Sequence, residues 1–371
     1  MLKQKELFYI SDRLSQVLLD DSPFGGIVVV LVGDPAQLPP VGGNSLWHNC
    51  TRKSANQNGL FLYRQFTTVI EWIENKRLDP SDPDATIFYD FLQRLRDGKN
   101  TESDWQLVRN KCSKYTMGLE EWKEKGFEDP KTTHLYTTNA DVGKHNEKCL
   151  SVNGQPIALI EAIHTGSGSR YDSSKFNGLE SYIFLAAESV ILLTHNLSTR
   201  YGLVNGSCGV VKDIIFLNNS KPPNLPDMVI VDFGKEYTGP NLFPYDELRK
   251  GWVPIAPKTA DWGTPTRVPG VYDKHTRTML PMHLCYYWTI WKSQGQTLKG
   301  KVAVALGKTE KEHGLSYTAF SRVTKFDNFG IMDGLTRHRL CTSVGAHKKV
   351  EHRVKEEARL RELCRLTIEK L

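Results

Sequence analysis

The chain has 371 residues, with 48 Lys plus Arg against 42 Asp plus Glu and a formal net charge of +6. Its 39% hydrophobic and 24% charged residues exclude a disordered or collagen-like chain, and the mildly basic balance is compatible with a nucleic-acid partner without requiring one. The length predicts two or three domains, because one hydrophobic core rarely grows beyond roughly 250–300 residues.

The cysteines argue against a zinc ribbon and against a secreted disulfide framework. Their number is odd, and no two stand at Cys-x-x-Cys spacing. The seven are Cys50, Cys112, Cys149, Cys208, Cys285, Cys341 and Cys364. The N-terminal residues have no apolar core of a signal peptide, and the longest aliphatic run, 27–32, is far short of the ~20 residues of a membrane span. These features favour an intracellular protein.

The first part of the chain predicts a helix, a strand and a polar turn. Apolar residues fall near one helical face at Leu2, Leu7, Ile10, Leu14, Val17 and Leu18. The all-apolar run IVVVLV (27–32) predicts a strand buried in a parallel α/β sheet, and GDPAQLPPVGG follows it. Ligands bind beyond the carboxyl ends of such strands, so Gly33, Asp34 and Gln37 are candidate site residues. The alternative is an ordinary turn rich in Pro and Gly.

Residues 60–110 are predicted to be helical, with a break at LDPSDP (78–83). The core candidates there are Trp72, Ile73, Ile87, Phe88, Phe91, Leu92 and Leu95. A short strand is expected at 133–139 and a helix at 141–150. The Gly/Ser-rich stretch 151–185 is predicted to be a surface loop.

Short alternating segments begin at Ser189: SVILLT, GSCGVVKDIIFL and MVIVDF. They predict a small antiparallel barrel or sandwich. Residues 240–280 are rich in Pro and Gly with little periodicity, and no regular element is predicted there. KVAVALG (301–307) predicts a strand and YTAFSRVT (317–324) a helix. The C-terminal stretch 351–371 predicts a solvated helix docked on one face, with no function assigned.

A phosphate-binding loop of the Walker A type does not occur in the 371 residues. The nearest candidate is LGKT, Leu306 to Thr309, but a Walker A loop requires glycine at position 302, which is Val. No other Gly-Lys-Ser/Thr is present.

Three segments nevertheless carry the residue types of nucleotide chemistry. Asp34 and Gln37 can hydrogen-bond a γ-phosphate or its attacking water, and Arg322 or Arg77 could stabilise charge in phosphoryl transfer. The alternative for each arginine is a surface charge or a helix-end ion pair. KSQGQT (292–297) combines a cation, a hydroxyl, two amides and a glycine, which suits contacts with a phosphate backbone; its alternative is a turn before the next strand.

In chain order, GDPAQLPPV, TIWKSQGQTL and YTAFSRVT resemble motifs III, V and VI of the Pif-like DNA helicases, the Pif/RecD branch of helicase superfamily 1. PFGG, FLQRLRDGKNTESDW, THLYTTNADVGKHNEKCL and NLSTRYGLVNGSCGVV are also similar to that family, so the likeness covers roughly residues 1–335. It implies an α/β fold of the RecA-like P-loop NTPase kind, with ATP between two RecA-like domains and a small β-barrel inserted in the second. It also implies ATP-dependent 5′-to-3′ unwinding of DNA in repair, recombination or telomere maintenance, in the nucleus or mitochondrion.

The resemblance assigns roles to single residues. It implies catalytic roles for Gln37 (motif III, γ-phosphate), Arg322 (motif VI, finger) and Arg77 (motif IV, a weaker match because ENKRLDP departs from the usual Arg-Gln pair). ATP, with Mg²⁺, would be contacted by Gly33, Asp34, Gln37, Gly295 and Arg322. Single-stranded DNA and duplex junctions would be contacted by Lys292, Ser293, Gln294, Asn205 and Gly206. The family's histidine before that lysine is Trp291 here, whose indole could stack on a base. No metal ligand is expected in this chain.

The resemblance also predicts how the chain is divided. Residues 1–75 would be the remainder of a first RecA-like domain, 76–188 and 281–340 the second, 189–280 the inserted barrel and loop, and 341–371 a C-terminal helix. Family members carry Walker A and an Asp-Glu pair upstream of motif III, so the chain is expected to be the C-terminal portion of a helicase. Three hypotheses stay open: a helicase without its N-terminal motor segment, a non-catalytic remnant that binds single-stranded DNA, and a partner-dependent or inert fragment.

Overall fold

The computed structural model describes residues 2–49, 54–79, 81–129, 132–152, 154–266, 270–298, 300–347 and 349–370; Cys50 and Pro80 of the predictions above lie outside them. The chain forms two compact units. Unit 1 combines residues 1–137 with 289–371, and unit 2 is the continuous segment 138–288. The division into the remainder of a first RecA-like domain, a second RecA-like domain, an inserted barrel and a C-terminal helix stays a prediction. No helix of the described chain is long and apolar enough to cross a membrane.

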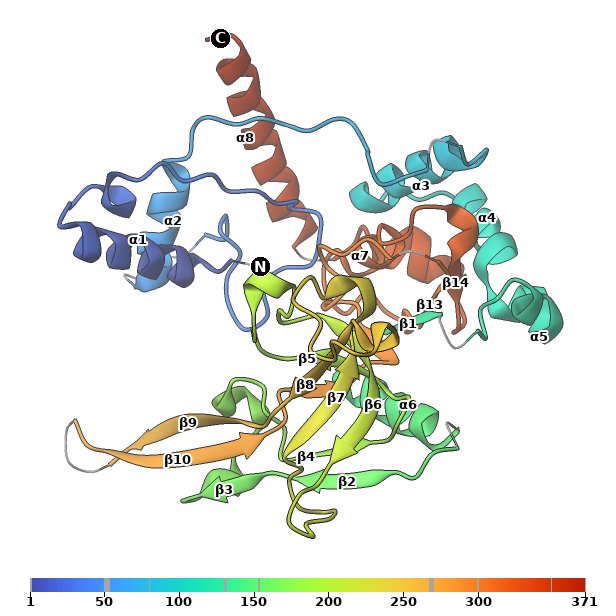
Figure 1. Ribbon diagram of the computed structural model, residues 1–371. Coiled ribbons are helices and arrows are strands. Elements are labelled where there is room, and N and C mark those ends of the chain that lie inside the picture. The colour runs from blue at the N-terminus through green and yellow to red at the C-terminus, as the bar shows by residue number, and fades with distance from the viewer. Residues whose placement is uncertain are drawn as a thin grey trace. The chain divides into compact units, whose positions relative to one another are not determined.

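Unit 1 contains a small parallel sheet with α3, α4, α5 and α7 near it, and α1 and α2 pack on each other away from that sheet (Figure 1). Its helices are α1 Gln4–Leu18, α2 Ala55–Arg64, α3 Ala85–Asp97, α4 Glu102–Cys112, α5 Lys114–Glu124, α7 Leu315–Phe320 and α8 Val350–Ile368. Its strands β1 (Thr133–Tyr136), β13 (Val302–Val304) and β14 (Phe329–Ile331) pair in parallel in that order, and β12 (Tyr287–Thr289) spans the junction at which the chain re-enters the unit. The strands predicted at 133–139 and 301–307 are confirmed within narrower bounds. The helix predicted at 317–324 is found as α7, which begins two residues earlier and ends at Phe320.

Aromatic packing holds α3 and α7 against the segment 326–331 in unit 1. Phe88 stacks on Phe326 with 4.7 Å between ring centroids, and Phe320 stacks on Phe329 at 3.9 Å. All four rings are fully buried. Aromatic pairs of this kind add about 0.5–1.5 kcal/mol each beyond the burial of area. The predicted core residues Phe88, Phe91, Leu92 and Leu95 are confirmed, since each is at most 4% exposed.

The prediction that Trp72, Ile73 and Ile87 are core residues is wrong, because their side chains are 80%, 86% and 47% exposed. The described residues of 65–84 are not helical, and α3 begins only at Ala85. This connection runs past α8 instead, where the amide of Val69 donates to the Thr367 hydroxyl at 3.1 Å. The apolar residues of this connection, such as Trp72 and Ile73, therefore do not form the buried face of a helix.

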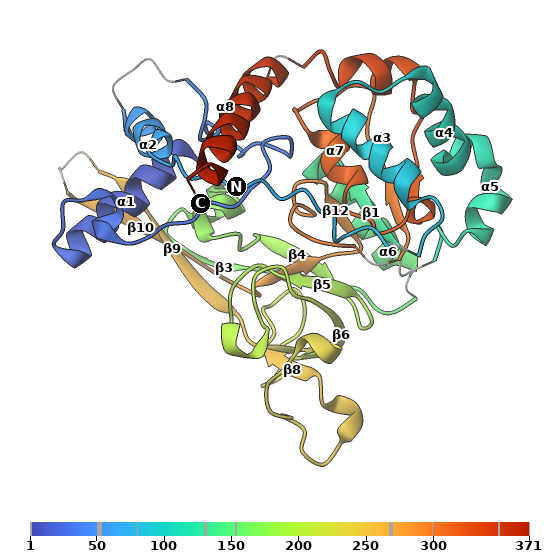
Figure 2. The ribbon, with the colours of Figure 1, turned by 90° about the horizontal axis from the view of Figure 1, so that it is seen from above.

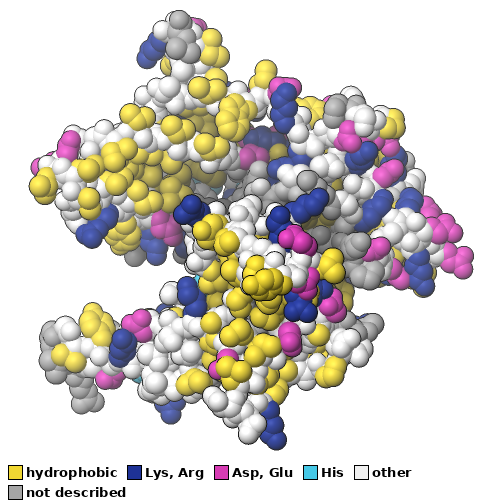
Figure 3. All heavy atoms as spheres, viewed as in Figure 1, with side chains coloured by type: hydrophobic (Ala, Val, Ile, Leu, Met, Phe, Trp, Pro, Cys, Tyr) yellow, Lys and Arg dark blue, Asp and Glu magenta, His cyan; other side chains and the backbone are white. Residues whose placement is uncertain are grey.

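The predicted buried strand at 27–32 is also wrong. No strand is assigned there, and Val28, Val30 and Val32 are 89%, 77% and 73% exposed. The alternate residues Val29 and Leu31 pack against the cluster formed by α1, α2 and Phe24. The run has strand periodicity but no partner strand within the described chain, so only one of its faces is covered. Figure 3 shows hydrophobic side chains gathered over this part of unit 1.

The predicted C-terminal helix exists as α8, but it is not merely solvated. Arg353, Glu356 and Glu357 are 1%, 3% and 7% exposed. The Tyr63 hydroxyl of α2 donates to Glu356 at 2.7 Å, and Arg96 of α3 pairs with Glu357 at 2.7 Å. Helix α8 thus joins the segment that contains α2 to the segment that contains α3 (Figure 2).

Over its described residues, unit 2 consists of one α-helix, several short 3-10 helices and antiparallel sheets. Its elements are α6 Asn139–Val152, β2 Ala158–Glu161, β3 Ile163–Thr165, β4 Tyr182–Leu185, β5 Val190–Leu193, β6 Cys208–Ile215, β7 Met228–Asp232, β8 Trp252–Ile255, β9 Lys258–Pro265, β10 Tyr272–Met279 and β11 Met282–Leu284. The sheets have the orders β11-β5-β6-β7-β8, β3-β10-β9 and β2-β4. The helix near 141–150 and the short strands after Ser189 are confirmed.

Two predictions for unit 2 are wrong. Stretches 151–185 and 240–280 contain β2 to β4 and β8 to β10, where a loop and no regular element were expected. Strand β10 was missed because two of its buried positions are polar, His275 at 6% and Arg277 at 1% exposed. Arg277 donates to the carbonyls of Leu179 and Gly168 at 2.8 and 3.1 Å, which makes its burial tolerable.

Replacing Tyr63 by Phe should reveal how much α8 contributes to unit 1. The change removes only the hydroxyl that donates to the buried Glu356 carboxylate, and we expect the free energy of unfolding to fall by about 1–3 kcal/mol. Urea denaturation followed by far-UV circular dichroism measures it. Tyr9→Phe, on the exposed side of α1, is the matched control and should shift stability by less than about 0.5 kcal/mol. Equal effects of the two changes would contradict the role of α8.

Candidate functional site

The segment Gly33–Leu38 is a tight loop that is organised by the Asp34 carboxylate. This carboxylate accepts hydrogen bonds from the amide of Ala36 at 2.9 Å and from Gln37 Nε2 at 3.5 Å. Arg96 of α3 pairs with it at 3.1 Å. Gly33 is exposed, and Gln37 is half-buried with only this long contact from its amide nitrogen. Asp34 therefore shapes the loop, whereas the Gln37 amide is weakly held.

The loop docks on α7 and on the segment 291–297. The amide of Leu38 donates to the Thr318 hydroxyl at 3.2 Å, and Gln294 Nε2 donates to the Leu38 carbonyl at 3.4 Å. Gly314 precedes α7 with a φ of +77°, and a Cβ there would lie 2.3 Å from the Ala36 carbonyl oxygen. Only glycine fits both this backbone conformation and this close approach.

Arg322 lies at the centre of the site and is fully buried. Its Nε donates to the Thr318 carbonyl at 2.8 Å, and its Nη1 donates to the carbonyls of Ser293 and Gln296 at 3.4 and 3.2 Å. Burial, together with the nearby Arg77, lowers the pKa of Arg322 to about 10, so the group stays charged at neutral pH. The guanidinium links the end of α7 to the segment 293–296.

Arg77 belongs to the same site although it lies 245 positions before Arg322 in the chain. Its Nε donates to the Thr297 hydroxyl at 3.1 Å and its Nη1 to the Ser321 carbonyl at 2.7 Å. Burial lowers the pKa of Arg77, and its proximity to Arg322 places two positive charges together. Such a pair is suited to an anionic ligand.

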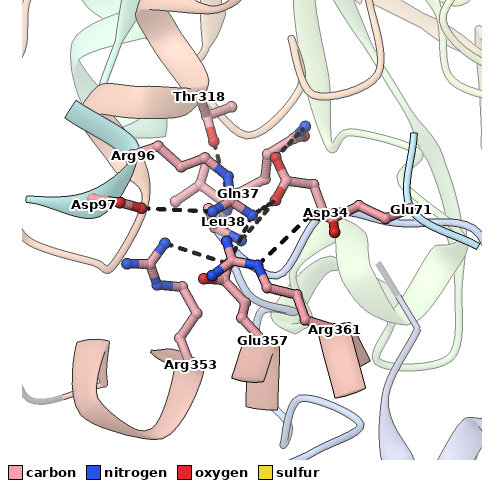
Figure 4. A network of polar contacts seen from close by, with 11 residues as sticks. Asp34, Gln37, Leu38, Glu71, Arg96, Asp97, Thr318, Arg353, Glu357 and Arg361 are labelled. Carbon is pink, nitrogen blue, oxygen red and sulfur yellow. Dashed lines mark hydrogen bonds and ion pairs between the residues drawn. The ribbon is translucent and has the colours of Figure 1, made fainter. Parts of the chain in front are cut away.

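A network of charges beside the loop was missed by the sequence analysis. Figure 4 shows Asp34, Arg96, Glu357 and Arg353 converging from the loop, α3 and α8. Burial works against the charge on Arg96, yet the carboxylates of Asp34 and Glu357 raise its pKa overall. Burial and the hydrogen-bonded Asp34 carboxylate raise the pKa of Tyr317. The i,i+4 spacing of Arg353 and Glu357 was the one signal in the sequence, and it could not name their partners.

The residues of unit 1 that are predicted to contact DNA differ in their exposure to solvent. Lys292 and Gly295 are exposed, the latter with a φ of +84°. Ser293 is fully buried, and its hydroxyl donates to the Ile290 carbonyl at 2.8 Å. Gln294 is half-buried, and its Oε1 is a buried atom without a partner. Trp291 is half-buried.

Asn205 and Gly206, in unit 2, form an exposed turn between β5 and β6. The amide of Ser207 donates to the Val204 carbonyl at 2.9 Å, and the amide of Asn205 donates to Asn196 Oδ1 at 2.8 Å. Gly206 has a φ of +101° and open space around it. Both residues are accessible to a ligand.

His313 directly precedes Gly314, the residue on which the loop docks, and its side chain is 6% exposed. Burial, reinforced by the nearby Arg353, lowers its pKa to about 4, although the Pro35 backbone opposes this through a hydrogen bond. The ring is therefore neutral at pH 7. Across the described residues, no group of three or more His, Cys, Asp or Glu side chains could hold a metal ion.

Comparison with known proteins agrees with this geometry. The family "PIF1-like helicase" matches residues 1–106. The chain is 28% identical over 320 residues to the ATP-dependent DNA helicase PIF1 of Danio rerio, an alignment that covers 84% of this chain and 41% of that protein. The chain is thus a distant relative of the PIF1 helicases over most of its length, and its first 106 residues match the PIF1-like helicase family. It spans about half the length of the curated relatives it matches.

Solved PIF1 helicases share the fold. The crystal structure of Pif1 helicase from Candida albicans matches with a TM-score of 0.68 at 21% identity, over 96% of this chain and 74% of that one. The Bacteroides Pif1 helicase in complex with ADP-AlF3 and ssDNA matches with a TM-score of 0.66 at 20% identity, over 97% of this chain and 74% of that one. The expected α/β class, a parallel sheet together with antiparallel sheets, is thereby confirmed.

Replacing Gly314 by Ala tests the docking of the loop on α7. The methyl group would collide with the Ala36 carbonyl and would also strain a positive φ, so we expect a loss of about 2–4 kcal/mol. Gly307→Ala is the matched control, because Gly307 has a φ of +74° with open space around it and should cost about 1–2 kcal/mol. Urea denaturation of both variants gives the difference, and equal losses would mean that the close contact is absent.

Replacing His313 by Gln should flatten the acid dependence of stability. A histidine with a folded pKa near 4 and an unfolded value near 6.5 contributes stability that is complete above pH 6.5 and is lost as pH falls toward 4. Between pH 7 and pH 5 the variant should lose about 1–2 kcal/mol less than the parent. His338→Gln, at an exposed position, is the control. Parallel pH profiles for the parent and His313→Gln would refute the assignment.

Proposed function

We propose that this chain is part of an ATP-dependent DNA helicase that couples ATP hydrolysis to 5′-to-3′ unwinding. One observation carries the proposal: four segments far apart in sequence meet in unit 1. Loop 33–38 is bonded to Thr318 and Gln294, Arg77 to Thr297 and Ser321, and Arg322 to the carbonyls of Ser293 and Gln296. The roles that the family resemblance assigns to these segments require this kind of convergence.

The contacts supply a way to transmit a nucleotide signal. A terminal phosphate would attract the Arg77 and Arg322 guanidiniums and the loosely held Gln37 amide. Any displacement of Arg322 alters its bonds to Ser293 and Gln296, and with them the segment that presents the exposed Lys292. Two nucleotide states would thus give two affinities for a DNA strand, which is what directional movement requires.

ATP and Mg²⁺ fit these residues only in part. Gln37, Arg77 and Arg322 suit a terminal phosphate by charge and hydrogen-bonding capacity. The 371 residues contain no Walker A loop, and the described ones offer no carboxylate cluster for Mg²⁺, since Asp34 is engaged by Ala36 and Arg96. The residues present would therefore read the γ-phosphate alone.

Two exposed segments support a second candidate function for these residues taken by themselves: binding of single-stranded DNA without hydrolysis. The exposed Lys292 and the exposed Asn205-Gly206 turn can contact a strand, and the net charge of +6 favours a polyanion. The expected nuclear or mitochondrial location and the roles in repair, recombination or telomere maintenance depend on the first candidate and are part of that proposal.

Fluorescence anisotropy with a labelled single-stranded oligonucleotide tests the DNA contact. We expect binding that weakens with salt, and Lys292→Ala should weaken it about three- to tenfold and reduce the salt slope by about 1, because one phosphate contact is lost. Lys5→Ala removes an exposed charge from α1 and is the control, with less than a twofold effect expected. Equal effects of the two changes would argue against the role of Lys292.

DNA-stimulated ATP hydrolysis separates the two candidate functions. Turnover by the 371-residue chain that is abolished in Arg322→Ala would support the helicase motor and contradict the binding-only candidate. Strand binding without turnover would support the binding-only candidate for these residues. Absence of both at low salt would contradict both proposals.

A further inference from the structure

Unit 1 contains a cavity of about 120 Å³ next to the 33–38 loop that none of the roles above uses. The loop, the segment 43–48, the residues before α7 and the first turn of α8 enclose it. Its cationic or potentially cationic lining is His48, His313, Lys349, His352 and Arg353. None of the described residues that line it is acidic, and Gln37 forms part of the wall.

Two buried nitrogen atoms on this lining lack a partner. They are Nε2 of His313, a residue 6% exposed, and Nε of Arg353, a residue 1% exposed. A buried polar atom without a hydrogen bond costs about 1–3 kcal/mol, so these atoms indicate that a ligand completes the site. The Arg353 N–H needs an oxygen acceptor. The His313 nitrogen takes a hydroxyl when neutral and an oxygen acceptor when protonated, and a partly protonated phosphate offers both.

The start of α8 adds to the attraction for an anion. This helix has 19 residues, and its N-cap residue, Lys349, makes no side-chain cap. The amides of the first turn and the helix dipole favour negative charge at this end. Lys349 Nζ pairs with Glu312 at 2.7 Å, and Arg353 Nη1 contacts Glu357 at 3.4 Å. These two carboxylates offset part of the positive charge, but neither lines the cavity.

We propose that this cavity binds a phosphate-type oxyanion. Its oxygens would accept from Arg353 Nε and from Lys349 Nζ, with His313 and His352 completing the shell. The anion could be the terminal phosphate of a nucleotide or free inorganic phosphate, which share this chemistry. The inference does not rest on the helicase proposal, because it requires neither DNA nor hydrolysis.

Titration of the full chain with inorganic phosphate by isothermal calorimetry tests the site, at an ionic strength held constant with sodium chloride. The test variant is the double change Lys349→Gln and His352→Gln, chosen because both side chains are exposed and the fold does not depend on them. We expect saturable phosphate binding that the double variant weakens at least tenfold. Arg365→Gln removes a positive charge from the exposed part of α8 and should change the affinity less than twofold.

The outcomes are distinct. Absence of saturable binding, an equal response to chloride, or unchanged affinity in the double variant would overturn the proposal. His313→Gln is the second variant; it keeps the parent fold if its near-neutral stability matches the parent's, and it should also weaken phosphate. If ATP displaces phosphate, and the double variant also lowers the affinity for ATP, the natural ligand is the terminal phosphate of a nucleotide. If ATP does not displace phosphate, the natural ligand is the free anion. Failure of strand binding or of ATP hydrolysis leaves either result unchanged.

Discussion

The burial of the Arg322 guanidinium is the constraint on which the arrangement of unit 1 depends. A cation in a low-dielectric interior is tolerated only when its N–H groups are hydrogen-bonded. Here the acceptors are the carbonyls of Thr318, Ser293 and Gln296 and the hydroxyl of Ser321. The carbonyls accept hydrogen bonds from the guanidinium but do not neutralise its charge, so burial lowers the pKa of Arg322. The segments that supply these carbonyls cannot separate without exposing an unsatisfied cation, so they behave as one body.

From this centre, a continuous series of contacts leads to the C-terminal helix. Thr318 holds the 33–38 loop through Leu38, Asp34 closes that loop, and Arg96 pairs with both Asp34 and Glu357. Negative and positive groups alternate along the series, which lets several charged side chains share a largely buried region. Helix α8 is therefore part of the support of the site. A truncation that removed it would take away Glu357, the carboxylate nearest to Arg96, and leave only Asp34 and Asp97 as its partners.

The sequence predicted the local parts of this structure well, because helical spacing and apolar runs are local signals. Helix α3 shows four buried apolar residues at helical spacing, and β13 is a short apolar run. Run 27–32 has the same local signal, but a strand also needs a neighbour, and no described strand pairs with it. Strand β10 fails in the opposite way: Arg277 is buried through carbonyls supplied by a distant loop, which no periodicity records.

The motifs located the residues of the candidate site but not the use that each side chain has. Ser293 carries a hydroxyl suited to a phosphate, yet its hydroxyl is bound to its own turn, and its carbonyl is what Arg322 needs. Arg96 pairs with Asp34, 62 positions before it, and with Glu357 on α8, so spacing along the chain could not reveal these pairings, nor could it place Arg353 at the cavity beside the loop.

Gln37 occupies the position at which these two features meet. Its loop is docked on α7 on one side, and its side chain forms part of the wall of the cavity lined by His313 and Arg353. Its amide nitrogen has a single contact of 3.5 Å, far weaker than the bonds of Asp34 or Arg322. A side chain held so loosely between rigid neighbours can turn at little cost toward whichever anion is present. The packed loop therefore fixes the position of the Gln37 backbone, and the bound anion sets the orientation of its side-chain amide.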